Sequence, residues 1–145
     1  MDGMTGAVVF QREQRVRFGH CDPAGIVFYP RYFEMLNELV EDWFAQGLGQ
    51  PFEQLIAERG LGMPTAQLDT RFKRISRHGD RLQQRIRLQR VGGSSITLAV
   101  AFDGDDGTRV EFGQVLVCTS LDTHRPHALP DALRAALQRA QEMTP

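Results

Sequence analysis

The feature that most constrains the fold is one strongly amphipathic stretch over residues 30–46. Its bulky apolar residues recur at spacings of three and four, as one face of an α-helix requires: Tyr32, Phe33, Leu36, Leu39, Val40, Trp43 and Phe44. Pro30 suits the first helical position, because the amide proton it lacks would have no partner there. Gly47 suits the left-handed residue that ends a helix. A helix with so wide an apolar face needs a second layer to cover it.

Alternating apolar residues predict an antiparallel sheet as that layer. One strand precedes the helix, over 8–18, and about four follow it, including segments at 82–88 and 96–102. The residues expected to share the buried side of these strands are Phe10, Val16, Phe18, Leu82, Ile86, Leu88, Ile96, Leu98, Val100 and Phe102. No repeat or linker divides the chain, so we expect a single α+β domain over 1–145.

Glycine-containing segments mark the ends of these elements. Turns are expected at 78–80, 92–94 and 105–107, because Asp and Gly tolerate positive φ. The strand over 110–117 changes parity at Gly113, since the apolar residues before it are even-numbered and those after it are odd-numbered. This change predicts a β-bulge at Gly113. Shorter helices are expected over 51–59 and 132–140.

Composition excludes several classes of function. The chain has 17 basic and 18 acidic residues and a net charge of −1, which gives no electrostatic footprint for nucleic acid. No apolar run approaches the roughly 20 residues of a membrane-spanning helix, and residues 1–9 lack the pattern of a signal peptide. Two cysteines, Cys21 and Cys118, are too few for a disulfide framework. We therefore expect a reducing, cytoplasmic setting and neither a membrane nor a nucleic-acid partner.

The segment 18–30 joins the first strand to the long helix and carries the candidate chemistry. Asp22 supplies a carboxylate just before a helix N-terminus, which exposes unpaired N–H groups and the positive end of the dipole. A carboxylate beside donors that polarise a carbonyl is an arrangement for acyl transfer. A purely structural role fits as well, because Asp-Pro-Ala-Gly is a good type I turn. Cys21 adjoins His20, so in extended chain the two point to opposite faces, which favours a small buried cysteine over a thiol–imidazole pair.

The same segment resembles the active-site loop and helix start of the 4-hydroxybenzoyl-CoA thioesterase family of hotdog-fold enzymes. The similarity runs through 20–33 and continues at 58–60 with Pro64 and at 79–80, so it covers nearly the whole chain, from about Gln14 to Leu137. It implies a hotdog fold, in which a long central helix is wrapped by a curved antiparallel sheet of about five strands. It also implies a homodimer or homotetramer whose acyl-thioester site is shared by two chains.

The resemblance assigns roles to individual residues. Asp22 would attack the thioester carbonyl or activate the water that does, and the backbone N–H of Tyr29 would bind the carbonyl oxygen. His20 would orient Asp22 or the loop backbone, although local hydrogen bonds account for it equally well. Some hotdog enzymes use a helix glutamate instead, which keeps Glu41 as the alternative acid.

Candidate substrate contacts complete the prediction. Asn37 interrupts the apolar stripe, so it either bonds backbone inside the core or contacts a polar substituent on the acyl group. Gly25, Val27, Met63 and Pro64 are the other expected acyl contacts. The phosphates of coenzyme A need basic or N–H-rich surface, for which the candidates are Arg71, Lys73, Arg74, Arg77, Arg90, Ser94 and Ser95. The run 73–78 lacks the proline usual in relatives, which loosens the alignment there. The histidines are not spaced as a zinc motif, and we expect no metal and no cofactor beyond the CoA of the substrate.

The sequence thus predicts a hydrolase that converts an acyl-CoA to free acid and CoA. An aromatic acyl group of hydroxybenzoyl or benzoyl type is favoured, with short or medium aliphatic groups as the alternative. A non-catalytic acyl-CoA-binding module is the competing hypothesis, since fold does not fix function; the intact Asp22 and Gly25 argue against it. A hotdog dehydratase would carry a catalytic histidine on the helix, and 30–46 has none.

Overall fold

The computed structural model describes residues 4–142. Its main layer is a five-stranded antiparallel sheet in the order β1-β4-β5-β6-β3, so β1 and β3 are the edges. The strands are β1 (Ala7–Arg15), β3 (Thr65–Phe72), β4 (Arg81–Val91), β5 (Ser95–Gly104) and β6 (Gly107–Val117). Two short strands, β2 (Leu61–Gly62) and β7 (Thr119–Ser120), pair separately.

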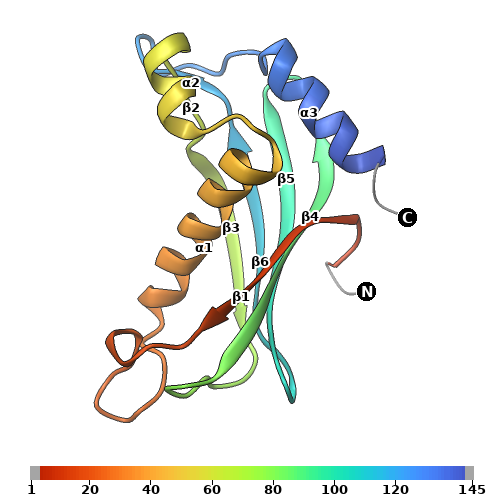
Figure 1. The fold of residues 1–145 in the computed structure, drawn as a ribbon. Helices are drawn as coiled ribbons and strands as arrows, with labels where there is room; N and C mark the ends of the chain where they lie inside the picture. Colours follow the sequence, from red (N-terminus) through yellow and green to blue (C-terminus); the bar gives the residue numbers. More distant parts are fainter. Residues whose placement is uncertain (1–3, 143–145) are drawn as a thin grey trace.

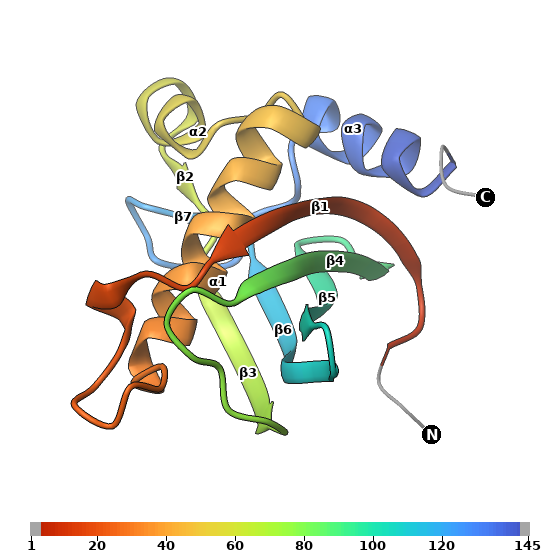
Figure 2. The same ribbon diagram turned by 60° about the horizontal axis from the view of Figure 1, so that its bottom comes forward.

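The long helix lies along one face of this sheet, which curves around it (Figures 1 and 2). It comprises α1 (Pro30–Asp42) and one following π-helical turn, η2 (Trp43–Gly47). The helices α2 (Phe52–Arg59) and α3 (Asp131–Glu142) lie at the end of the molecule opposite the loop that enters α1 (Figure 1). This arrangement confirms the α+β class and the hotdog fold. Within the described residues, no helix is long and apolar enough to cross a membrane.

The core forms where α1 meets the sheet. The predicted stripe is confirmed, since all its members are buried except Phe33, which is partly buried. From the sheet, the predicted residues of β4 and β5 face it and are also buried. Aromatic rings join the two layers, with Phe33 and Phe112 centroids 5.9 Å apart and Tyr32 and Phe102 centroids 6.3 Å apart. Each such side chain contributes roughly 1.5–3 kcal/mol when fully buried, which holds the helix on the sheet.

The first strand ends earlier than predicted. β1 stops at Arg15, and the Val16 N–H then bonds the Asp80 carbonyl at 2.7 Å. Beyond Val16 the chain leaves the sheet for a short 3₁₀ turn, η1 (Phe18–His20). Phe18 is 80% exposed, so its expected place on the buried side of the strand is wrong.

The predicted left-handed end of the helix at Gly47 is also wrong. The helix widens into a π turn, in which the Leu48 N–H bonds the Trp43 carbonyl at 2.9 Å. The left-handed glycine is Gly49, with φ of +66°. Gly47 is needed for a different reason, because a Cβ there would lie 2.7 Å from Cδ1 of the Trp43 ring.

The bulge of the last long strand lies at Arg109 and not at Gly113. Val110 pairs with Phe102 while Thr108 pairs with Asp103, which leaves Arg109 as the extra residue. Gly113 pairs in register with both neighbouring strands. The even-numbered residues of β6 face the core on both sides of Gly113. The parity seemed to change because one of them, Gln114, is polar, although it is only 2% exposed.

The other predicted turns and the two shorter helices are present. Gly79 and Gly107 have φ of +92° and +120°, and residues 92–94 link β4 to β5. α2 ends at the left-handed Gly60, and α3 is slightly longer than predicted at both ends.

Candidate active site

The loop before α1 is a small closed hairpin that carries Asp22. Cys21 and Val27 form an antiparallel bridge at its base. Within it, the Gly25 N–H donates to the Asp22 carbonyl and the Asp22 N–H donates to the Ile26 carbonyl, both at 2.9 Å. Gly25 has φ of +81°, a left-handed conformation that favours glycine. The four-residue turn predicted from Asp-Pro-Ala-Gly is therefore present.

The carboxylate of Asp22 is both fixed and accessible. Its Oδ1 accepts the Ala24 N–H at 2.9 Å, which holds the side chain across the turn. The residue is half-buried and lines a cavity of about 370 Å³ together with Phe18, His78 and the loop itself. The structural role as a turn residue is thus compatible with contact to a ligand in this cavity.

The N–H of Tyr29 is placed as a donor at the helix N-terminus. Tyr29 is the N-cap and Pro30, the first helical residue, has no N–H. The neighbouring N–H groups are used, because Phe28 donates to the His20 carbonyl and Arg31 to the Phe28 carbonyl, both at 2.9 Å. Among residues 4–142 the Tyr29 N–H makes no hydrogen bond. Such a donor, at the positive end of a helix, is suited to bind an oxygen that gains negative charge.

The ring of His20 bonds locally. Its Nδ1 accepts the Arg17 N–H at 2.9 Å, and its carbonyl accepts the Phe28 N–H. Burial lowers the pKa of His20, which outweighs the opposite effect of Glu38, so the ring is neutral near pH 7. These contacts fit the orientation of the loop backbone, and in the described part of the chain no hydrogen bond joins this ring to Asp22. A catalytic role of His20 stays a prediction.

Cys21 is not an activated thiol. Burial, together with the Asp22 carboxylate, raises the pKa of the Cys21 thiol, and its Sγ lies 3.6 Å from the Arg17 carbonyl oxygen. A protonated thiol is a weak nucleophile. Cys21 is only partly buried and lines the cavity beside Asp22, so the buried position expected for it is wrong.

A second cavity, of about 250 Å³, adjoins Tyr29. Its apolar wall includes the rings of Tyr29 and Phe72, whose centroids lie 6.1 Å apart. Lys73 and Arg74 also line it, directly after β3. Apolar and basic surface therefore meet beside Tyr29.

The expected acyl contacts do not all meet within one chain. Gly25 lies in the Asp22 loop and Val27 in the adjoining core, where it is 7% exposed. Met63 and Pro64 precede β3, whereas Phe72, beside Tyr29, ends it. This eight-residue strand spans about 26 Å, so Met63 and Pro64 are remote from Asp22 in their own chain.

Asn37 is exposed on α1. The alternative in which its amide bonds backbone inside the core is therefore excluded. It follows Phe33 by one turn on the same helix face, and Phe33 packs on Phe72 of β3 with centroids 6.3 Å apart. Asn37 thus lies on the flank of α1 next to the exposed edge of the sheet.

The candidate coenzyme A residues divide between two ends of the sheet. Lys73 and Arg74 lie at the Asp22 end, where they also pair with Glu111 at 3.3 Å and Asp106 at 3.9 Å. Arg90, Ser94 and Ser95 lie at the far end of β4, an eleven-residue strand that spans about 36 Å. The exposed Arg71 and Arg77 flank the first group. One chain alone does not gather all of them around Asp22.

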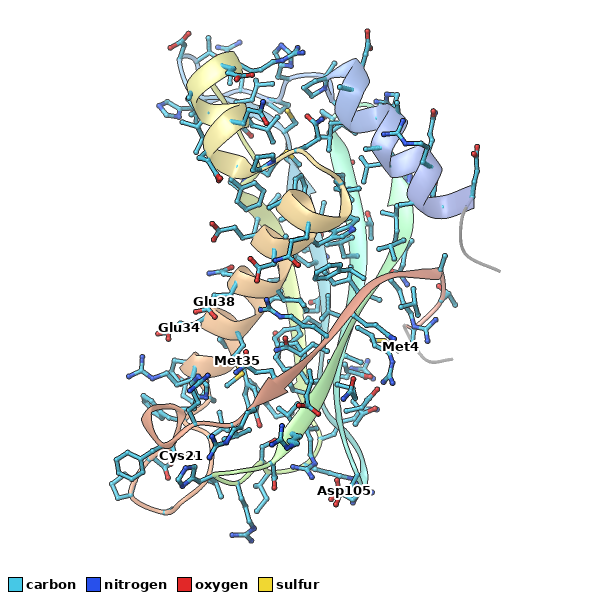
Figure 3. All side chains as sticks on the ribbon, viewed as in Figure 1. Met4, Cys21, Glu34, Met35, Glu38 and Asp105 are labelled. Carbon is cyan, nitrogen blue, oxygen red and sulfur yellow. The ribbon has the colours of Figure 1, made fainter. Side chains whose placement is uncertain are left out.

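The helix glutamates are remote from the Asp22 loop or point to solvent. Glu34 and Glu38 project from α1 away from the sheet (Figure 3). Glu41 is exposed and lies eleven residues after Pro30, about 16 Å along the helix axis. Glu41 is therefore too far from the Tyr29 N–H of the same chain to act with it on one carbonyl group.

Sequence reasoning missed a buried polar cluster next to the loop. Arg109 and Ser76 are 5% and 1% exposed, although arginine and serine normally lie at the surface. Only the position of Arg109 just after a hairpin turn, where bulges are frequent, hinted at it. No group of three or more His, Cys, Asp or Glu residues suited to a metal ion occurs within 4–142.

Comparison with known proteins identifies the class. Residues 16–137 match the family model of the thioesterase-like superfamily. A 1,4-dihydroxy-2-naphthoyl-CoA hydrolase of Thermosynechococcus vestitus is 31% identical over 131 residues, which covers 90% of this chain and 89% of the relative. A 4-hydroxybenzoyl-CoA thioesterase of a Pseudomonas species is 38% identical over 61 residues, covering 41% of this chain and 43% of the relative. The solved structure of a gentisyl-coenzyme A thioesterase superposes with a TM-score of 0.76 at 25% identity, covering 86% of this chain and 99% of that one.

The chain belongs to the thioesterase-like superfamily. It is a thioester hydrolase, and the resemblance carried by residues 20–33 is confirmed.

Proposed function

We propose that this thioester hydrolase cleaves aromatic acyl-CoA substrates to the free acid and CoA. The observation that carries the proposal is the unpaired N–H of Tyr29 at the start of α1, held in the same short loop as the Asp22 carboxylate. The relatives support the aromatic class, since the acyl groups in their names are 1,4-dihydroxy-2-naphthoyl, 4-hydroxybenzoyl and gentisyl. All three are hydroxylated aromatic acids.

In the proposed reaction Asp22 acts at the carbonyl carbon. As a nucleophile it forms a mixed anhydride and expels the CoA thiolate, which takes a proton from water; a second water then hydrolyses the anhydride and restores the carboxylate. As a general base it takes a proton from the water that attacks instead. Both routes place negative charge on the thioester oxygen, which the Tyr29 N–H and the helix dipole stabilise. The loss of one such donor typically costs about 2.7–4 kcal/mol in the transition state.

A homodimer would complete the site. β3 is an edge strand with unpaired backbone groups on one side, and its Leu68 and Phe72 are 38% and 52% exposed. Such an edge pairs readily with a second strand. A two-fold axis makes β3 of two copies antiparallel, so Met63 and Pro64 of one copy would lie beside Tyr29 of the other. This explains why the expected acyl contacts are separated within one chain, and sedimentation of the purified protein tests it.

Acyl contacts follow from this arrangement. Asn37 lies on the helix flank beside β3 and would offer its amide to a ring hydroxyl in the shared pocket. Lys73 and Arg74 line the cavity next to Tyr29, and their long side chains would reach toward the phosphates at the far end of the pantetheine arm of CoA. His20 supports the loop backbone through its carbonyl and ring hydrogen bonds. Every chemical role is thus assigned to the chain's own side chains and backbone, with no added cofactor.

The test is thiol release from a panel of aromatic, short-chain and long-chain acyl-CoA thioesters. We expect aromatic substrates to be hydrolysed fastest, and Asp22→Asn to lower kcat on the order of several hundred-fold. Asparagine keeps an oxygen for the Ala24 N–H, so the loop geometry is preserved in this variant. A fully active Asp22→Asn enzyme would overturn the role of Asp22. Binding of every acyl-CoA without turnover would instead establish a non-catalytic module.

A further inference from the structure

A polar cluster around one buried arginine joins the β5–β6 hairpin to the segment that follows β3. Its centre is the Arg109 side chain, 6% exposed. Nη1 of Arg109 donates to Asp80 Oδ2 at 2.7 Å and to the Ile75 carbonyl at 3.1 Å, and Nε donates to Asp106 Oδ1 at 2.7 Å. Figure 3 shows Asp105, at the tip of this hairpin, at the same end of the molecule as Cys21.

The cluster fixes the segment 75–80. Asp80 Oδ2 accepts the Arg77 N–H at 2.9 Å in addition to Arg109. Burial acts to raise the pKa of Asp80, but the hydrogen bonds from Arg109 and the Arg77 N–H outweigh it and leave the pKa below its usual range. The carboxylate is therefore ionised at neutral pH. A charge-assisted bond to a buried guanidinium is among the strongest polar contacts in a protein.

Ser76 connects this fixed segment to both parts of the hydrolytic site. Its carbonyl accepts the Val27 N–H at 2.9 Å, at the base of the Asp22 loop. Its Oγ accepts the Tyr32 hydroxyl proton at 2.9 Å, in the first turn of α1, and lies 3.3 Å from Nη1 of Arg109. The loop that carries Asp22 and the turn that carries the Tyr29 N–H thus meet at one serine.

We propose that Arg109 and Ser76 are positioning residues of the hydrolytic site, which together set the Asp22 loop relative to the first turn of α1. This inference rests on the proposed function. A carbonyl held at the Tyr29 N–H must lie at attack distance from Asp22, or from the water that Asp22 activates. That distance is fixed only if the loop and the helix keep one relative placement. A displacement of about 1 Å at a reacting centre can cost on the order of 100-fold in rate.

Two conservative variants remove opposite ends of one buried hydrogen bond. Ser76→Ala deletes the junction hydroxyl but keeps the carbonyl that holds Val27, and Tyr32→Phe deletes the hydroxyl on the helix side. We expect each to lower kcat by about 10-fold, a part of the loss that a 1 Å displacement causes, with KM within about twofold. Because they break the same bond, the double variant should lose no more than the worse single variant. Multiplying losses would overturn the junction role.

Two substitutions of Arg109 should lower kcat to different extents. Arg109→Met should lower kcat more than Ser76→Ala, on the order of 100-fold. Arg109→Lys should recover part of the rate, since an ammonium still reaches one carboxylate but cannot bond all the partners of the guanidinium fork. Equal kcat in the methionine and lysine variants would overturn the part assigned to Arg109.

Matched controls come from the same chain. Ser120→Ala removes a hydroxyl that accepts the Asp122 and Thr123 N–H groups, both at 3.3 Å, near α2 and β2. Arg85→Met removes an ion pair with Asp103, at 2.8 Å, on the outer face of the sheet. Both should keep the wild-type kcat. Thermal melting shows whether Ser76→Ala and Tyr32→Phe are folded. If both are folded and also keep the wild-type kcat, the inference is wrong.

A second readout is independent of turnover. Hydrogen exchange of the amides in 21–32 should be faster in Ser76→Ala and Tyr32→Phe than in wild type or Ser120→Ala. Unchanged exchange would overturn the inference even if the enzyme is active. If no acyl-CoA is hydrolysed by wild type but exchange rises as expected, the positioning contact stands and it is the proposed function that fails.

Discussion

Close packing of Gly47 on the chain's single tryptophan predicts an unusual effect of a small substitution. In a helical turn, replacing glycine by alanine ordinarily stabilises by about 1 kcal/mol. Here the added Cβ would lie 2.7 Å from Cδ1 and 3.3 Å from Nε1 of Trp43. We therefore expect Gly47→Ala to destabilise the protein, opposite to its helix propensity.

The magnitude follows from how little the ring can move. Trp43 is fully buried, and Phe44 packs edge-on against it with centroids 5.3 Å apart. Overpacking of a well-filled core typically costs about 1–3 kcal/mol. After the propensity gain of about 1 kcal/mol is subtracted, the net loss should be up to about 2 kcal/mol. For a chain of this size each kcal/mol lowers Tm by about 3–5 °C.

Urea unfolding followed by Trp43 fluorescence measures this change, at one protein concentration for all variants. Gly93→Ala is the matched control, because no atom lies within 4 Å of its Cβ position. Gly49→Asn is a second control, since asparagine tolerates the left-handed φ of +66° at that position. A Gly47→Ala protein as stable as Gly93→Ala would refute the packing explanation.

Three further predictions concern the site. Asp22→Ala, unlike Asp22→Asn, removes the acceptor of the Ala24 N–H and should lower the free energy of unfolding by about 0.5–1.5 kcal/mol in urea melts; equal stability of the two variants would contradict the turn role. Asn37→Leu should reduce the preference in kcat/KM for a ring-hydroxylated acyl-CoA over its unsubstituted analogue by about 10-fold, the equivalent of one hydrogen bond; an unchanged ratio would show that Asn37 does not read the hydroxyl. The pKa of Asp80 is lowered in the folded state, so the stability that its carboxylate contributes to the fold is complete above its unfolded pKa of about 3.9 and is lost as the pH falls through the folded pKa. In Asp80→Asn the urea midpoint should therefore fall less steeply with decreasing pH below about pH 4 than in wild type. An equally steep fall in both proteins would exclude Asp80 as the source of this acid sensitivity.

Local patterns made the helix and the Asp22 loop predictable. The stripe from Tyr32 to Phe44 is set by residues within about four helical turns of one another, and the turn at Asp22 by four consecutive residues. The helix and the turn both follow from the periodicity and the backbone preferences of neighbouring residues, which can be read from the sequence. The structure accordingly confirms the helix and the turn where they were predicted.

Polar residues with distant partners were not predictable. Gln114 faces the core because its amide bonds Thr65 Oγ1 at 2.9 Å, a contact across 49 residues. Arg109 is buried because Asp80 and the Ile75 carbonyl, about 30 residues away, accept its protons. Phe18 is the opposite case, an apolar residue that was expected on the buried side of the first strand but is exposed. The strand ends before it, where the Val16 N–H bonds the Asp80 carbonyl. In each case a tertiary contact outweighed the local pattern.

The pairing of β1 has a consequence for synthesis of the chain. Within residues 4–142, β1 pairs only with β4, from Ala7 with Leu88 to Arg15 with Arg81, and the Val16 N–H bonds the Asp80 carbonyl. The Asp22 loop lies between this strand and α1, and its support reaches as far as Arg109. At about 5–20 residues per second, a ribosome needs on the order of 5–20 s after Asp22 to make that support. The Asp22 loop therefore reaches its place in the folded chain only after most of the sheet has been made.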